Sequence, residues 1–160
     1  MKKIIVAITA TFFLFACNNA NKPAAEDEVK SETIENSNTP KTPPGYDPNR
    51  GIGKFSSVDL GEKLDKKMAN AGRAVSDVKC SSCHKMTDEK LVGPGWKGVT
   101  TRYTPQWIMN FITNPDEMLD IDPKAQAQLE ICLVRMPNQN LADEEARQLL
   151  EYMRENDGVK

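Results

Sequence analysis

Apolar residues recur at helical spacing in four stretches of the chain after residue 58. The first stretch covers residues 59–78, where lysines separate the apolar positions. Two later stretches begin with a capping residue followed by proline, at Thr104 and Asp122, which is a typical helix start. The last covers residues 143–154 and has acidic residues in its first turn. No segment alternates between apolar and polar residues as a half-buried strand does, so the sequence predicts an all-α domain of about four helices.

Glycine and proline interrupt this helical pattern at two places. The segment LVGPGWKGV at residues 91–99 has a density of glycine and proline that predicts a loop. Pro137 follows Met136 at the end of the third helical stretch and should end that helix, because proline cannot continue a helix from the preceding turn. We expect both segments to connect helices.

The N-terminal residues have the layout of an export signal. Lys2 and Lys3 precede an apolar run at residues 4–16, which is too short to span a bilayer as a helix, and Cys17 follows. The letters LFAC resemble the lipobox of bacterial lipoproteins, which implies a signal peptide at residues 1–16 and acylation of Cys17. An ordinary cleaved signal with an incidental cysteine is the alternative. Either way, we expect a location outside the cytoplasm.

Residues 17–57 are rich in Asn, Glu, Lys, Thr and Pro and lack apolar periodicity, which is typical of a flexible linker. The folded domain is therefore predicted at residues 58–160. The pattern leaves open whether Tyr46, Ile52 and Phe55 dock the end of the linker on this domain.

The net charge of −2 hides an uneven distribution along the chain. Residues 59–102 contain nine basic and six acidic side chains, whereas residues 103–160 contain five basic and eleven acidic ones. The domain should carry a dipole, and no concentrated basic surface of the kind that binds nucleic acid is indicated.

Cys80, Cys83 and the only histidine, His84, stand within five positions of one another. This cluster suits three chemistries, which are covalent haem attachment, a thiol-disulfide couple and metal binding. The thiol couple normally follows a strand, and none is predicted. Zinc would need Cys132 as a fourth ligand, but Cys132 falls in a helical apolar stripe, where a free cysteine packs as a small apolar residue.

Around this cluster, residues 59–157 resemble the class I mono-haem cytochromes c. The resemblance rests on the CSSCH motif, on Gly72 eight positions before Cys80, on VGPGW and on the Met-Pro step before the last helix. It implies a small helical fold around one haem c bound covalently to Cys80 and Cys83, with His84 on the iron. It also assigns to the Pro94 carbonyl the role of accepting the imidazole N–H, which orients the ring and raises its basicity.

The resemblance further implies a methionine as the sixth iron ligand. A second histidine ligand is excluded within this chain, because His84 is the only histidine. Met136 matches the Met-Pro loop of the family. Met118 is the alternative, since it lies in an apparent loop and the other methionines fit helix faces or lie too close to His84. Trp96, Arg102, Tyr103 and Trp107 fall where family members place apolar haem contacts and propionate donors.

These features predict a one-electron carrier and not an enzyme, because a His/Met iron has no free position for a substrate. The expected partners are an exported or membrane-bound electron donor and acceptor, with the lipid on Cys17 holding the protein at the periplasmic side of the envelope. The insertion between Trp107 and Met136 is similar to small cytochromes that serve terminal reductases, so nitrous oxide reductase is one candidate acceptor. A haem peroxidase or ligand sensor with a labile sixth ligand is the alternative.

Overall fold

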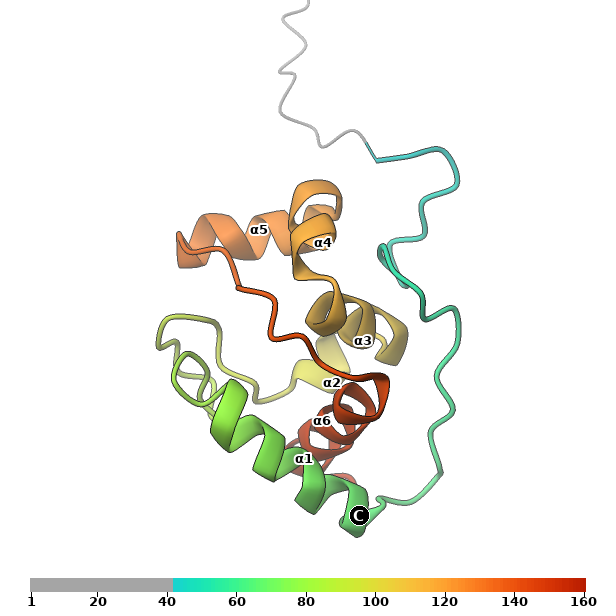
Figure 1. The fold of residues 1–160 in the computed structure, drawn as a ribbon, viewed down its shortest axis with the longest axis vertical. Helices are drawn as coiled ribbons and strands as arrows, with labels where there is room; N and C mark the ends of the chain where they lie inside the picture. The colour runs from blue at the N-terminus through green and yellow to red at the C-terminus, as the bar shows by residue number, and fades with distance from the viewer. Residues whose placement is uncertain (1–41) are drawn as a thin grey trace, which may run out of the picture. The chain divides into compact units, whose positions relative to one another are not determined.

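The computed structural model describes residues 42–160, which contain six α-helices and the segments between them (Figure 1). No strand occurs in this part of the chain, so the all-α prediction is confirmed. The helices are, in chain order, α1 (Lys66–Lys79), α2 (Val99–Arg102), α3 (Pro105–Thr113), α4 (Pro115–Ile121), α5 (Pro123–Cys132) and α6 (Asp143–Asn156).

Two of these helices, α2 and α4, are additional to the four that the apolar pattern predicts. Pro115 lies at the boundary between α3 and α4. Proline does end α3, but it also suits the first position of a new helix, where its missing N–H is not needed. Asn114 is therefore both the C-cap residue of α3 and the N-cap residue of α4.

The predicted capping residues begin their helices by binding the exposed N–H groups of the first turn. The Thr104 hydroxyl accepts from the Trp107 N–H at 3.2 Å, and the Asp122 carboxylate accepts from the Ala125 N–H at 2.8 Å. The first helix starts later than predicted, because Asp65 caps it by accepting from the Met68 N–H at 2.9 Å. Residues 59–64 precede α1 as an irregular segment.

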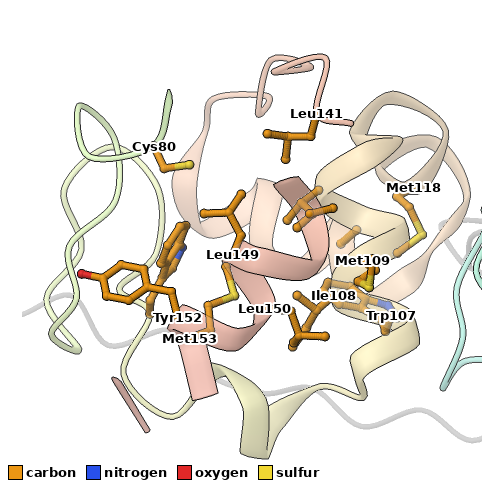
Figure 2. Close-up of a cluster of buried hydrophobic side chains, with 14 of the residues drawn as sticks. Cys80, Trp107, Ile108, Met109, Met118, Leu141, Leu149, Leu150, Tyr152 and Met153 are labelled. Carbon is orange, nitrogen blue, oxygen red and sulfur yellow. The ribbon is translucent and has the colours of Figure 1, made fainter. Parts of the chain in front are cut away.

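Helices α1 and α6 pack against each other (Figure 1), and they cross at Gly72. A Cβ atom at Gly72 would lie 2.0 Å from the Gln148 carbonyl oxygen, so only glycine allows the two backbones to approach this closely. Helix α6 also contributes to the hydrophobic core, with a predicted stripe that is buried along its length (Figure 2): Ala146, Leu149, Leu150 and Met153. The crossing therefore places the end of α1, and the cysteine cluster after it, beside the core.

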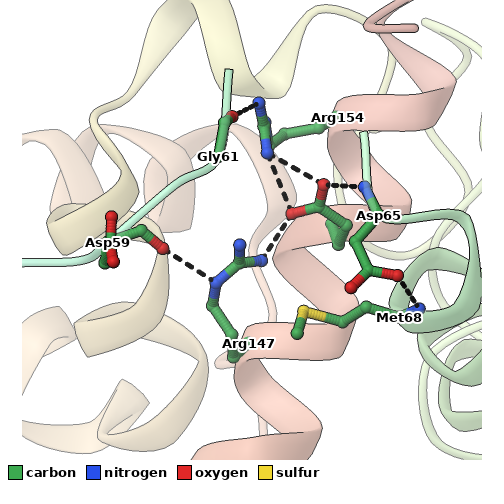
Figure 3. A network of polar contacts seen from close by, with 7 residues as sticks. Asp59, Gly61, Asp65, Met68, Arg147 and Arg154 are labelled. Carbon is green, nitrogen blue, oxygen red and sulfur yellow. Dashed lines mark hydrogen bonds and ion pairs between the residues drawn. The ribbon is translucent and has the colours of Figure 1, made fainter. Parts of the chain in front are cut away.

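A buried carboxylate joins α6 to the segment before α1 (Figure 3). Glu151 is fully buried and accepts hydrogen bonds from the Asp65 N–H at 2.9 Å, from Arg147 at 2.6 Å and from Arg154 at 2.8 Å. Arg154 also donates to the Gly61 carbonyl at 2.9 Å. Burial by itself would raise the pKa of Glu151, but these donors outweigh it and lower the pKa below its usual range.

The end of the predicted linker packs on the domain, a possibility that the sequence pattern leaves open. We call residues 46–58 the strap. Asn110 of α3 is fully buried, and its side chain binds the strap through the Arg50 carbonyl at 3.0 Å, the Phe55 N–H at 2.9 Å and the Phe55 carbonyl at 3.0 Å. Tyr46 donates its hydroxyl proton to the Asp122 carboxylate. The packed domain therefore includes part of the polar stretch that composition assigned to the linker.

Residues 1–41 lie outside the described residues, and with them the predicted signal peptide and Cys17. Within the part that the structure describes, no helix is long and apolar enough to cross a membrane.

Candidate functional site

The cysteine cluster forms a tight turn directly after α1. Cys80 ends the helix with its N–H on the Ser76 carbonyl at 2.9 Å. The Cys80 carbonyl then accepts from the Cys83 N–H at 3.0 Å and from the His84 N–H at 2.9 Å. These backbone bonds hold both thiols and the imidazole on one short, ordered segment.

The glycine-proline loop fixes the ring of His84. The Nδ1–H group of the imidazole donates to the Pro94 carbonyl at 2.9 Å, because a carbonyl can only accept. A Cβ atom at position 93 would lie 2.4 Å from the imidazole Cε1, so Gly93 allows the loop to pass close to the ring. With Nδ1 protonated in the neutral ring, Nε2 keeps its lone pair and can bind a metal.

The surroundings keep these groups uncharged. Burial lowers the pKa of His84, partly opposed by its hydrogen bond to Pro94, so the imidazole is neutral at physiological pH. Burial raises the pKa of the Cys80 thiol to about 11, although Lys79 acts in the opposite direction. Cys80 is buried, whereas Cys83 is half-buried.

The other two chemistries for this cluster find no support in residues 42–160. Cys80, Cys83 and Cys132 form no disulfide there, and no strand leads to the pair of thiols. No group of three or more His, Cys, Asp or Glu side chains is arranged to hold a metal ion in the described range. Cys132 is half-buried and faces a cavity, so the prediction that it is a buried core residue was wrong. Its position at the last residue of α5 places it at the end of the apolar stripe.

The predicted site residues border two cavities that share a wall. A cavity of about 400 Å³ is lined by Cys83, His84, Pro94, Trp96, Arg102, Trp107 and Met136 among others. A second cavity of about 190 Å³ is bordered by Cys80, Cys83, His84, Trp96 and Met136. All eight residues predicted for the cofactor site therefore meet at one place, although they come from five separate segments of the chain.

The two candidate methionines lie in different surroundings. Met136 is half-buried, belongs to the segment between α5 and α6, and borders both cavities. Met118 is fully buried in α4, borders neither of these cavities, and accepts the Ile52 N–H on its sulfur at 3.0 Å. The structure therefore brings Met136 to the cavity that His84 lines, whereas Met118 packs against the strap.

The profile of the cytochrome c family matches residues 69–157, which is more than half of the chain. The chain belongs to the cytochrome c family. No curated protein sequence gives a significant match. Cytochromes c carry covalently bound haem c and transfer electrons, so this protein is a haem c protein of electron transfer, and members of the family are in general not enzymes.

Solved structures of cytochromes c from Rhodothermus marinus resemble this one. A structure described as cytochrome c is 33% identical, with a TM-score of 0.67, over 69% of this chain and 97% of that chain. An engineered form is 32% identical, with a TM-score of 0.66, over 69% of this chain and 98% of that chain. A further structure of the engineered protein, described as bound to a carbene intermediate, is 32% identical with a TM-score of 0.63 over the same shares.

The residues of this cytochrome c fit a covalently bound haem. Cys80 and Cys83 border the smaller cavity, burial keeps the Cys80 thiol protonated, and His84 presents a free Nε2 beside Gly93, which leaves room next to the ring. The larger cavity lies in the size range of cofactor sites and has a mostly apolar lining. Cys80 and Cys83 would hold the porphyrin, and His84 would hold the iron.

Arg102 and the aromatic residues form the wall on the α2 and α3 side. Arg102 lines the larger cavity and also donates to the Gly95 carbonyl at 3.2 Å, so it ties down the glycine-proline loop. Trp107 is 2% exposed and stacks on Tyr103, with ring centroids 4.1 Å apart, and on Phe111, at 5.1 Å.

Sequence reasoning missed several residues of this wall. Phe111 was placed only on an apolar helix face, and its spacing of one turn from Trp107 was the signal that both share a cavity. Gln128 of α5 donates to the Tyr103 hydroxyl at 2.7 Å, and both side chains line the larger cavity. Nothing in the local sequence pattern pairs these two residues, because they are 25 positions apart.

Proposed function

We propose that this cytochrome c is a one-electron carrier in which His84 and Met136 ligate the haem iron. The observation that supports the proposal most directly is that both side chains border the same cavities. Met153 also borders them, but it is 2% exposed and packs within α6, whereas Met136 lies on a segment outside the helices.

Haem c, when bound, supplies a one-electron couple, and thioether ligation favours its reduced state. The chain's own residues then have distinct tasks. The Pro94 carbonyl keeps the Nδ1 proton of His84 in place and so keeps Nε2 directed to the metal. The buried side chains of Trp96 and Trp107 give the cavity an apolar wall. One electron enters from a protein donor and leaves to a protein acceptor, with no bond made or broken.

The proposed partners are exported or membrane-bound respiratory enzymes, among them a terminal reductase such as nitrous oxide reductase. We further propose that residues 1–16 direct export and that a lipid on Cys17 holds the protein at the periplasmic side of the envelope. The support is the sequence layout, in which a short apolar run ends at LFAC. Acyl chains on one cysteine give stable attachment, because each buried methylene contributes about 0.8 kcal/mol.

The alternative is a haem peroxidase or a ligand sensor with a labile sixth ligand. The only histidine is committed to the CSSCH motif, so the chain has no second imidazole to serve as an acid-base group in peroxide chemistry. This argument favours the carrier over the peroxidase.

Absorption spectra of the purified holoprotein in both redox states, with and without CO, test the proposal. A His/Met iron should show the weak red charge-transfer band of thioether ligation in the oxidised state and bind CO poorly. Ready CO binding by the native protein would contradict the carrier and favour the sensor.

A further inference from the structure

A buried carboxylate lies behind the aromatic wall of the haem cavity. Asp122 has no exposed surface. One of its oxygens caps α5 by accepting the Ala125 N–H at 2.8 Å. The other accepts the indole Nε1–H of Trp107 at 2.8 Å and the hydroxyl proton of Tyr46. Capping explains only the first contact, so the second oxygen has another role.

Asp122 has neutral donors and no cationic partner. No Lys, Arg or His side chain within residues 42–160 forms an ion pair with it. The basic side chains of this region bind carbonyls instead: Lys124 donates to Pro48 at 2.7 Å, and Arg50 donates to Gly53 at 2.6 Å. The Ala125 N–H and the Trp107 indole N–H can only donate, and the Tyr46 hydroxyl donates to the same carboxylate, so this set of partners suits the ionised form. The result is a buried negative charge without a counter-charge.

Only one side chain separates this charge from the haem cavity. Trp107 binds Asp122 with its indole N–H and also lines the larger cavity, together with its stacking partners Tyr103 and Phe111. The indole is 2% exposed, so water does not screen the path between the carboxylate and the cavity. Charge interactions across such a medium are stronger and act over longer distances than in water.

We infer that Asp122 sets the reduction potential of this cytochrome c, by lowering it, and that the strap completes the site through Tyr46. The inference rests on the proposed one-electron carrier function. Loss of one electron leaves one more positive charge in the cavity, and a fixed buried anion stabilises that oxidised state relative to the reduced one. Asp122 acts through Trp107 and is a positioning and potential-setting residue.

The strap contributes a hydrogen-bond donor, the Tyr46 hydroxyl, which partly offsets the negative charge of the Asp122 carboxylate. Burial raises the pKa of the Tyr46 hydroxyl, and its hydrogen bond to Asp122 raises it further, so Tyr46 remains a proton donor to the carboxylate. Tyr46 and Asp122 are 76 positions apart, so this arrangement exists only when the strap is packed. The polar segment before the domain is thereby part of the redox site.

The decisive experiment is a spectroelectrochemical titration of the Asp122→Asn holoprotein. Asparagine also caps helices and resembles aspartate in shape, so the fold is retained while the charge is removed. We expect the equilibrium with a donor of fixed potential to shift at least about threefold toward the reduced state, which is roughly 28 mV for a one-electron couple. The matched control is Asp116→Asn, because Asp116 is exposed on α4 and lines neither cavity. Its potential should remain that of the native protein.

The spectrum separates this inference from the carrier proposal. An Asp122→Asn protein with the native spectrum and an unchanged potential would overturn the inference and leave the carrier intact. A native protein without the thioether band would instead overturn the proposed ligation.

Tyr46→Phe provides a second variant if Asp122→Asn does not fold. It removes one neutral donor and keeps the charge, so the potential should fall. A rise in the potential of Tyr46→Phe would overturn the inference.

Discussion

At the scale of single residues, Gly93 and Pro94 determine how the imidazole ring of His84 is held. Gly93 gives the loop access to the face of His84, and the Pro94 carbonyl then fixes which ring nitrogen carries the proton. Neither residue needs to touch the iron to control it, because the tautomer of the imidazole decides whether Nε2 can bind. Met136, the proposed sixth ligand, lies on the segment between α5 and α6.

Met136→Ala should abolish the red charge-transfer band of the oxidised protein and open a position for CO. The potential should fall by on the order of 0.1 V, well within the roughly 0.8 V range that axial ligands span. The reason is that loss of the thioether removes a ligand that favours the reduced iron. Absorption spectroscopy and a redox titration measure both effects.

Met118→Leu and Met153→Leu are the controls for this prediction. Both exchange a buried methionine for a residue of similar volume, which usually costs less than about 1.5 kcal/mol. Each should keep the band. If either substitution removes it while Met136→Ala does not, the assignment of the sixth ligand is wrong.

At the scale of elements, the crossing of α1 and α6 connects the haem-binding turn to the end of the chain. Gly72 permits the close approach, and Glu151 ties the start of α1 to α6 through backbone and guanidinium donors (Figure 3). A buried carboxylate that is fully paired stabilises the fold only while it is ionised. The crossing should therefore be sensitive to acid.

Glu151→Gln should destabilise the protein at pH 7 by roughly 3 kcal/mol, because it leaves the buried guanidinium of Arg154 and the half-buried one of Arg147 without their counter-charge. Since the pKa of Glu151 is lowered in the folded state, its stabilisation is complete above the usual glutamate value of 4.5 and is lost as the pH falls through the folded value. Urea unfolding at several pH values, in one redox state, measures the free energy of unfolding. The difference in this free energy between the native and variant proteins should become smaller as the pH falls.

Glu144→Gln is the matched control, because Glu144 lies on the same helix and is exposed. It should change the free energy of unfolding by less than about 0.5 kcal/mol at every pH. If the loss of unfolding free energy caused by Glu151→Gln is the same at neutral and acidic pH, packing and not charge stabilises the crossing.

Helix α3 binds the strap through the side chain of Asn110. Asn110→Ala would leave the Phe55 N–H and the Arg50 carbonyl without their partner, while the Phe55 carbonyl keeps the Arg50 Nε–H at 3.2 Å, so we expect a loss of roughly 2–4 kcal/mol in unfolding free energy. Hydrogen exchange at the Phe55 amide should become faster. Asn70→Ala, on the exposed surface of α1, should leave both quantities unchanged. Equal effects of the two substitutions would contradict the anchoring role of Asn110.

At the scale of the whole molecule, the sequence predicted what local spacing determines. Cys80, Cys83, His84 and Pro94 lie close together along the chain, so their common site could be inferred from the motif. The sequence pattern leaves the packing of the strap open, because its few apolar residues show no periodicity and Asn110 binds its backbone groups, which the sequence does not reveal. The contact between Tyr46 and Asp122 joins residues 76 positions apart, which no local pattern records.

Packing of the strap also limits which part of the chain can act as a tether. The folded domain begins before residue 58. If Cys17 carries lipid, the segment between the lipid and the domain is therefore shorter than the composition suggests.

Cys17→Ser should transfer the protein from the detergent phase to the aqueous phase in Triton X-114 partitioning, because it removes acyl chains that contribute about 0.8 kcal/mol per buried methylene. The haem spectrum should not change. Asn19→Ser, which alters a neighbouring residue and keeps the thiol, should stay in the detergent phase. A Cys17→Ser protein that remains in that phase would contradict lipidation at this cysteine.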